Sequence, residues 1–163
     1  MREFDYPRHH FQKSATLPAQ ERLFVTFETQ PWNMVINASN STIGVTVQDV
    51  CLQIYSVLMA YTSRAEFEGQ DEERRNNIEQ SFWNNRSSEM SLPKASRLGP
   101  GIRRFDWLGE QTMFGGLVLE DRQEILEQFS PDEAHVPVLR LLCTSDVAAE
   151  VQCKCYRLAC WSR

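Results

Sequence analysis

Seven apolar side chains recur at helical spacing in the middle of the chain, and this pattern most constrains the fold. They are Val47, Val50, Cys51, Ile54, Val57, Leu58 and Tyr61. Their period places them along one face of a helix. Thr46 precedes the run and Asp49 follows three residues later, which is the pattern of a capping box at a helix start. We therefore predict a helix over 46–60 whose wide apolar face is buried against a sheet.

Strand-like segments lie on both sides of that helix. Residues 21–28 and 32–37 are rich in β-branched and aromatic side chains, and Pro31 separates them. Such a short link favours an antiparallel pair. Four further segments are predicted as strands: an edge strand at 4–11, a hairpin of 103–108 with 112–119, and a last strand at 136–143. Gly115-Gly116 inside the second hairpin strand indicates a bulge or a close backbone approach.

Two more helices are predicted after the first. Ser63 and Glu66 repeat the capping signature, and Gly69 is suited to end that short helix. A long helix over 71–86 has a narrow apolar face of Ile78 and Phe82, with Trp83 beside them. A loop over 87–101 and a helical turn over 121–129 follow. The fold class expected is α+β: a small antiparallel sheet of about four to six strands with two main helices packed on one face.

Length and composition indicate one ordinary domain. The chain has 163 residues, 42% of them hydrophobic, and a net charge of −5. We expect a single α+β domain over 1–143 and a cysteine-containing tail over 144–163. The tail is either an amphipathic helix capped by Ser145 or Asp146, or disordered. The acidic balance, without any basic patch, argues against nucleic acid as a partner.

The chain shows no membrane-spanning or secretory signal. No apolar run approaches the length of a membrane span, and the first residues lack a continuous apolar core. Five cysteines, an odd number, fit free thiols better than a disulfide framework. We therefore expect an intracellular, cytoplasmic protein that does not bind membranes.

Several short motifs together resemble a family of fungal domains of unknown activity, DUF6699. Pro31-Trp32 starts a strand, Thr46-Val47-x-Asp49-Val50 opens the helix, and Ile54-Tyr55 follows in mid-helix. Segments 104–109 (Arg-Phe-Asp-Trp-Leu-Gly) and 112–117 (Thr-Met-Phe-Gly-Gly-Leu) come later in the same order. The resemblance spans roughly residues 4–142. It implies a small antiparallel sheet packed against helices, and it transfers no catalytic or binding residue.

The sequence departs from the family pattern in two places. The first strand lacks the usual aspartate-valine lead into a proline pair. The tail beyond Leu142, which carries four of the five cysteines, has no family counterpart.

Three tail cysteines form the densest group of thiols. Cys153 and Cys155 are separated by one residue, and Cys160 follows. Zinc sites require four ligands, usually in pairs two to four residues apart, so a fourth ligand would come from Cys143 or a histidine. A tail of free cysteines explains the pattern more simply. We therefore expect no metal and no cofactor.

No catalytic set is recognisable among the histidines and acids. The histidines are His9, His10 and His135, and no nucleophile elbow, metalloprotease motif or phosphate loop accompanies them. Asp49 is explained as a helix cap. Asp106 lies between Phe105 and Trp107 on a predicted strand, so it faces the opposite side from those rings and is expected in solvent.

These observations favour a non-catalytic intracellular binding module that holds a protein or peptide at an exposed sheet face or edge. The alternative is an enzyme with an acid/base site around Asp106 and His135. A zinc-dependent tail module is a third interpretation. An exposed subset of four large rings would mark an interaction surface. They are Trp32, Trp83, Trp107 and Phe114.

Overall fold

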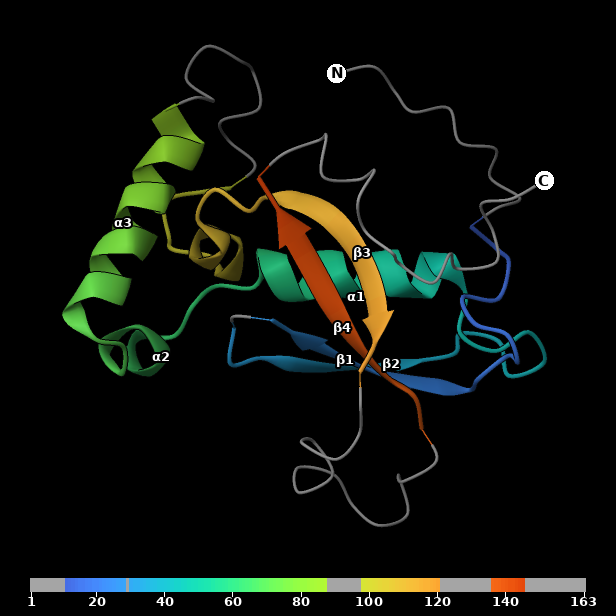
Figure 1. Ribbon diagram of the computed structural model, residues 1–163. Helices are drawn as coiled ribbons and strands as arrows, with labels where there is room; N and C mark the ends of the chain where they lie inside the picture. Colours follow the sequence, from blue (N-terminus) through green and yellow to red (C-terminus); the bar gives the residue numbers. More distant parts are fainter. Residues whose placement is uncertain (1–10, 29, 88–97, 121–135, 146–163) are drawn as a thin grey trace. The chain divides into compact units, whose positions relative to one another are not determined.

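The computed structural model describes residues 11–28, 30–87, 98–120 and 136–145 (Figure 1). These residues form two compact units. We call the described parts of Met1–Ile54 and Gly116–Leu142 the sheet unit, and those of Tyr55–Gly115 together with Cys143 and its successors the helical unit. The boundary between them falls within three elements, namely α1 (Val47–Met59), β3 (Met113–Leu119) and β4 (Val138–Thr144).

The sheet unit contains most of a four-stranded sheet with the order β2-β1-β4-β3. The strands are β1 (Arg22–Phe27), β2 (Asn33–Asn37), β3 (Met113–Leu119) and β4 (Val138–Thr144). β1 and β2 pair antiparallel, with Arg22 opposite Asn37 and Thr26 opposite Asn33. The antiparallel pair expected around Pro31 is thereby confirmed, and the α+β class holds.

The sheet is mixed rather than purely antiparallel. β1 and β4 pair in parallel, with Phe24 opposite Val138 and Phe27 opposite Leu141, whereas the arrows of β3 and β4 run in opposite directions (Figure 1). Parallel neighbours need a long crossover connection, and every helix of the described chain lies between β1 and β4 in sequence. The apolar pattern of a strand is the same in either direction, so the sequence alone did not reveal the parallel pair.

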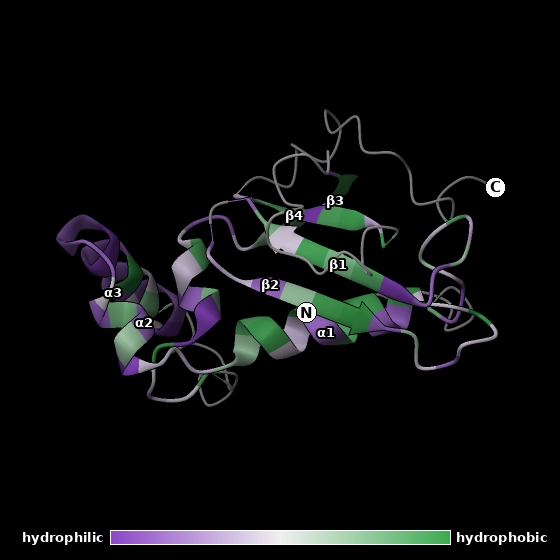
Figure 2. Ribbon diagram, turned by 90° about the horizontal axis from the view of Figure 1, so that it is seen from below, coloured by the Kyte–Doolittle hydropathy of each residue, from purple (hydrophilic) through white to green (hydrophobic). Residues whose placement is uncertain are grey.

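The core of the sheet unit is centred on β1. Residues 23–27 of β1 are all buried, as expected for a central strand covered on both faces. Phe27 packs edge-to-face against Trp32, with ring centroids 5.8 Å apart. Trp32 is therefore a core side chain. In Figure 2 the strands are largely apolar.

The helix predicted over 46–60 is α1 (Val47–Met59), and its capping box is present. The main-chain N–H of Thr46 donates to Asp49 Oδ2 at 2.8 Å, and the N–H of Asp49 donates to Thr46 Oγ1 at 3.1 Å. Burial raises the pKa of Asp49, but the hydrogen bonds from Thr46 and Ser39 outweigh it and hold that pKa below its usual value.

The predicted apolar stripe of α1 is buried only in part. Val50 is buried in the sheet unit, whereas Cys51 is exposed. Around the helix axis, Cys51 lies at the edge of the apolar stripe. The buried part of the stripe contains Val50. Leu52, the next residue along α1, is exposed as well.

The helical unit contains α2 (Arg64–Glu68), α3 (Glu72–Ser87) and the 3₁₀ helix η3 (Arg104–Leu108). The capping box before α2 is confirmed: Ser63 N–H donates to Glu66 Oε2 at 2.7 Å, and Glu66 N–H donates to Ser63 Oγ at 3.1 Å. Gly69 is the C-cap. α3 is mostly hydrophilic (Figure 2). Because α3 and the sheet belong to different units, the prediction that two helices share one sheet face stays a prediction.

Several predicted elements lie outside the described residues. They are the strand at 4–11 except for its last residue, the turn at 121–129, the tail beyond residue 145 and most of the loop at 87–101. Within the ranges that are described, none of the helices has the length and apolar character needed to cross a membrane.

We predict that Thr46→Ala lowers the free energy of unfolding by about 1 kcal/mol, because the α1 N-terminus loses its side-chain cap. Urea denaturation followed by circular dichroism measures the loss. Thr42→Ala, in an exposed turn, is the control and should change stability by less than about 0.5 kcal/mol. Equal losses in the two variants would contradict the role assigned to the cap.

Candidate functional site

The segment predicted as a strand over 103–108 is instead the 3₁₀ helix η3, so the predicted hairpin with 112–119 is wrong. The N–H of Asp106 donates to Arg103 O at 2.9 Å, and Asp106 Oδ2 accepts the N–H of Arg103 at 2.8 Å. These two bonds close a tight turn. A short acidic side chain that bonds the backbone three residues earlier competes with strand pairing, and here it prevails.

The expectation that Asp106 faces solvent is also wrong, because its exposed fraction is 0%. Its Oδ1 accepts hydrogen bonds from Asn85 Nδ2 at 2.9 Å and from Arg86 Nη1 at 3.0 Å. With the bond from Arg103 N–H, three donors surround the carboxylate. A buried carboxylate requires such compensation because it has lost its hydration. Asp106 thus fastens η3 to the end of α3.

Arg86, the charged partner of Asp106, also holds the segment before η3. Its Nε donates to Gly99 O at 2.9 Å, and its Nη2 donates to Gly101 O at 2.8 Å. Its guanidinium carbon lies 3.7 Å from the centroid of the Phe82 ring. The side chain is 14% exposed. One guanidinium therefore connects α3, η3 and residues 99–101.

Arg103 provides a second clamp on the same segment. Its guanidinium donates to Leu98 O, Met59 O and the Tyr61 hydroxyl, and it lies 4.2 Å from the centroid of the Tyr61 ring. A Cβ on Gly101 would come within 2.8 Å of Tyr61 Cε1. Only glycine fits at this position without displacing the ring.

The opposite side of η3 is held by residues near α2. Trp107 Nε1 donates to Thr62 Oγ1 at 2.8 Å, and Arg104 Nη2 lies 2.7 Å from Glu66 Oε1. The N–H of Ser63 and, next, the bond from Arg104 lower the pKa of Glu66 to about 2 from 4.5. These contacts fix η3 from several directions.

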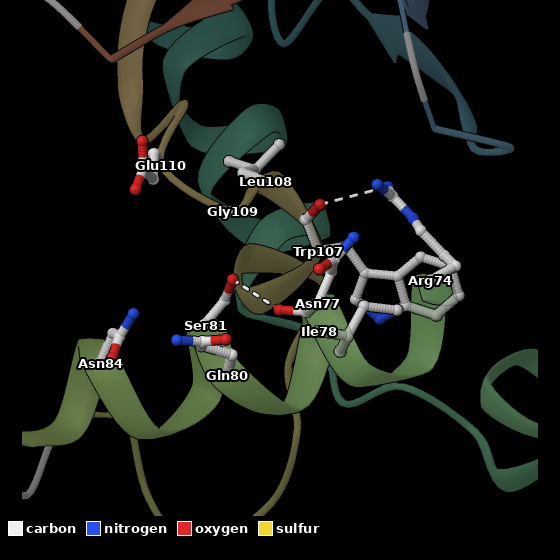
Figure 3. A pocket seen from close by; sticks show the side chains of 10 residues that line it. All are labelled: Arg74, Asn77, Ile78, Gln80, Ser81, Asn84, Trp107, Leu108, Gly109 and Glu110. Carbon is white, nitrogen blue, oxygen red and sulfur yellow. Dashed lines mark hydrogen bonds between the residues drawn. The ribbon is translucent and has the colours of Figure 1, made fainter. Parts of the chain in front are cut away.

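A groove of about 380 Å³ lies between α3 and η3, and we call it the α3–η3 groove (Figure 3). Arg74 spans one end, where its Nη2 donates to Trp107 O at 3.2 Å. Ser81 Oγ donates to Asn77 O at 2.8 Å within α3. The lining comprises Arg74, Asn77, Ile78, Gln80, Ser81, Asn84, Trp107, Leu108, Gly109 and Glu110.

The groove lining is polar and mostly uncharged. Asn77, Gln80 and Asn84 contribute side-chain amides from α3, and Arg74 and Glu110 are its charged residues. Gly109 bounds the other wall with a φ of +63°, a conformation that side-chain-bearing residues rarely adopt. Amides both donate and accept hydrogen bonds, so this lining suits a neutral ligand with both kinds of group.

The residues that the sequence singled out have different outcomes in the structure. Asp106 is a buried structural acid and Asp49 is a cap, while His9, His10 and His135 lie outside the described residues, as do Cys153, Cys155 and Cys160. Cys51 is a free cysteine. Within the described ranges, no three His, Cys, Asp or Glu side chains are grouped as metal ligands.

Of the rings considered as an interaction surface, Trp32 and Trp107 are core side chains, whereas Trp83 and Phe114 are exposed. Sequence reasoning missed the α3–η3 groove. Its available signal was the spacing of Asn77, Gln80 and Asn84, which places three amides on one face of the predicted helix.

We predict that Asp106→Asn lowers the free energy of unfolding by about 3 kcal/mol, because Arg86 is left with an uncompensated charge and an amide N–H faces other donors. Chemical denaturation of the full chain measures the change. Glu110→Gln, an exposed acid in the same unit, should change stability by no more than about 0.5 kcal/mol. A loss below about 1 kcal/mol for Asp106→Asn would refute this role.

We predict that Glu66→Gln costs about 1 kcal/mol of stability at pH 7, because it weakens the α2 capping box and the pair with Arg104. The folded pKa of Glu66 is lowered, so its stabilisation is complete above pH 4.5 and is lost as the pH falls toward 2. Unfolding measured from pH 7 to 2 should show the difference from wild type shrinking over that window. Glu68→Gln, at an exposed pair, is the control; a pH-independent difference for Glu66→Gln would contradict the assignment.

The comparisons with known proteins agree with the motif analysis. The searches of curated proteins and of solved structures found no match. The model of a family of unknown function, DUF6699, matches residues 2–127 of the 163. That range includes Pro31-Trp32, the opening of α1 and the η3 segment at 104–109. The chain therefore belongs to the DUF6699 family.

Proposed function

We propose that this chain is a non-catalytic binding module for a protein segment and that the α3–η3 groove is its binding surface. The observation that carries the proposal is the groove itself: a hollow of about 380 Å³ with a polar, mostly neutral lining. Cavities of this size that are already formed are typical of ligand sites.

The bracing of the groove walls supports binding. Asp106 and Arg86 join η3 to the C-terminal end of α3, and Arg74 joins the other end of the groove to Trp107 O. A ligand that enters a groove held in this way does not have to bring the two walls together on binding. The entropic cost of association is correspondingly small.

The chemistry of the lining also favours binding over catalysis. Among the lining residues the single carboxylate is that of Glu110, which is exposed. The acid considered for catalysis, Asp106, accepts three hydrogen bonds and has no exposed surface. Such a carboxylate is poorly placed to exchange a proton with a substrate.

The strands at the sheet edges offer a second surface for the same function. Val35 on β2 and Leu119 on β3 are 41% and 66% exposed. Both belong to edge strands in the order β2-β1-β4-β3. We favour the α3–η3 groove because it is hollowed as well as exposed.

The proposal includes an intracellular, cytoplasmic location. Cys51 is a free thiol, which a reducing compartment preserves. The acidic balance of the chain supports solubility there and disfavours nucleic acid as the partner.

The test is a quantitative pull-down of the tagged full chain from native cell extract, with partners identified by mass spectrometry. We predict that wild type retains a stoichiometric protein partner and that Gln80→Trp, which fills the α3–η3 groove, loses it. Asn76→Trp is the matched control, because Asn76 is exposed on α3 and does not line the groove.

Two outcomes would contradict this function. Partner retention by Gln80→Trp would move binding to another surface. Absence of a partner, together with turnover in a metabolite screen of the same protein, would replace the binding module with an enzyme.

A further inference from the structure

We propose that the α3–η3 groove binds an extended, uncharged peptide segment and that the side-chain amides of α3 pair with the peptide main chain. This inference rests on the proposed function and adds the chemical class of its ligand. The amides concerned are those of Asn77, Gln80 and Asn84 (Figure 3).

The three amides are spaced along α3 on the scale of one to two residues of an extended chain. With a helical rise of about 1.5 Å per residue, Asn77 and Gln80 are about 4.5 Å apart along α3, and Gln80 and Asn84 about 6 Å. An extended peptide advances about 3.3 Å per residue, so two residues cover about 6.6 Å. The amides are therefore placed to meet groups on a few consecutive peptide residues.

The hydrogen-bonding capacity of these side chains matches a main chain as well. Every peptide unit presents one N–H donor and one C=O acceptor. Asn and Gln amides also offer both kinds of group and carry no charge. A side-chain amide is thereby suited to bond a peptide unit whatever side chain that unit carries.

The charges around the groove disfavour an ionic ligand. Arg74 already donates to Trp107 O and lies with its guanidinium carbon 6.0 Å from the Trp107 ring centroid. Glu110 contributes an opposite charge to the same lining. A phosphate or a carboxylate would meet both signs, and a cation would meet Arg74. The neutral amides of the lining are then the groups that remain to recognise a ligand.

The aromatic residues of the lining disfavour ligands that stack. Trp107 belongs to the lining but is only 2% exposed, so it presents no free face to a sugar ring or a nucleobase. Trp83 is 67% exposed but is not part of the lining. Main-chain recognition needs no stacking platform.

The experiment starts from a phage-displayed library of random peptides selected on the full chain. Enriched peptides are then synthesised, and their binding to the full chain is measured by calorimetry. We expect the enriched sequences to be predominantly uncharged. Asn77→Ala combined with Gln80→Ala should weaken binding about tenfold, as expected for the loss of two hydrogen bonds. Asn76→Ala should bind as wild type does.

A second readout tests main-chain recognition directly. N-methylation of single peptide bonds removes one N–H donor at a time, and it should weaken binding at two or more adjacent positions. Replacement of peptide side chains by alanine should weaken binding less than N-methylation does. Thermal unfolding of each protein variant verifies that its fold is intact.

The outcomes that overturn this inference differ from those that overturn the proposed function. Enriched peptides that bind the Asn77/Gln80 double variant as tightly as wild type, or that tolerate N-methylation, refute the amide pairing. An empty selection also refutes it, while a partner displaced by Gln80→Trp in the pull-down would still support a binding module. If the selection is empty and the pull-down finds no such partner, both the amide pairing and the binding module are refuted.

Discussion

The buried ion pair between Asp106 and Arg86 is the interaction on which the arrangement of the helical unit depends. The two side chains meet at 3.0 Å with almost no access to water. Each then uses its remaining hydrogen-bonding groups on the surrounding main chain, Asp106 on the N–H of Arg103 and Arg86 on the carbonyls of Gly99 and Gly101. A pair of this kind adds little net stability, but breaking it strands a charge. It therefore specifies where η3 lies against α3.

The segment at 104–109, which carries part of the family resemblance, is held in place by further contacts. Arg104 pairs with Glu66, Trp107 donates to Thr62, and Gly109 adopts a positive φ. These residues build the framework, and Trp107 and Gly109 form part of one wall of the α3–η3 groove. The polar groups that we propose contact a ligand come instead from α3, whose hydrophilic sequence carries no recognisable motif. Framework and proposed recognition surface are thus carried by different elements.

Much of the local structure was predictable, because it depends on contacts between residues close in sequence. The capping boxes at Thr46–Asp49 and Ser63–Glu66 are closed by bonds across three residues, and both are present. The strand prediction at 103–108 failed although its cause is equally local. Apolar residues alternate around Asp106 as they do in a strand, but the bond from Arg103 N–H to the Asp106 carboxylate favours a turn. The groove was not predictable from sequence, because its second wall comes from residues about thirty positions further along the chain.

The sequence by itself determined the α+β class, the positions of α1, α2 and α3, the antiparallel pair of β1 with β2, and membership of the DUF6699 family. Hydrophobic period, caps and turn residues encode these features, and each acts over a few residues. Only the tertiary structure decided that β1 runs parallel to β4, that Asp106 is a buried ion-pair partner and that the amides of α3 face η3. These features depend on which distant segments meet, and the free energy that selects such meetings comes from burial and charge compensation summed over the whole fold.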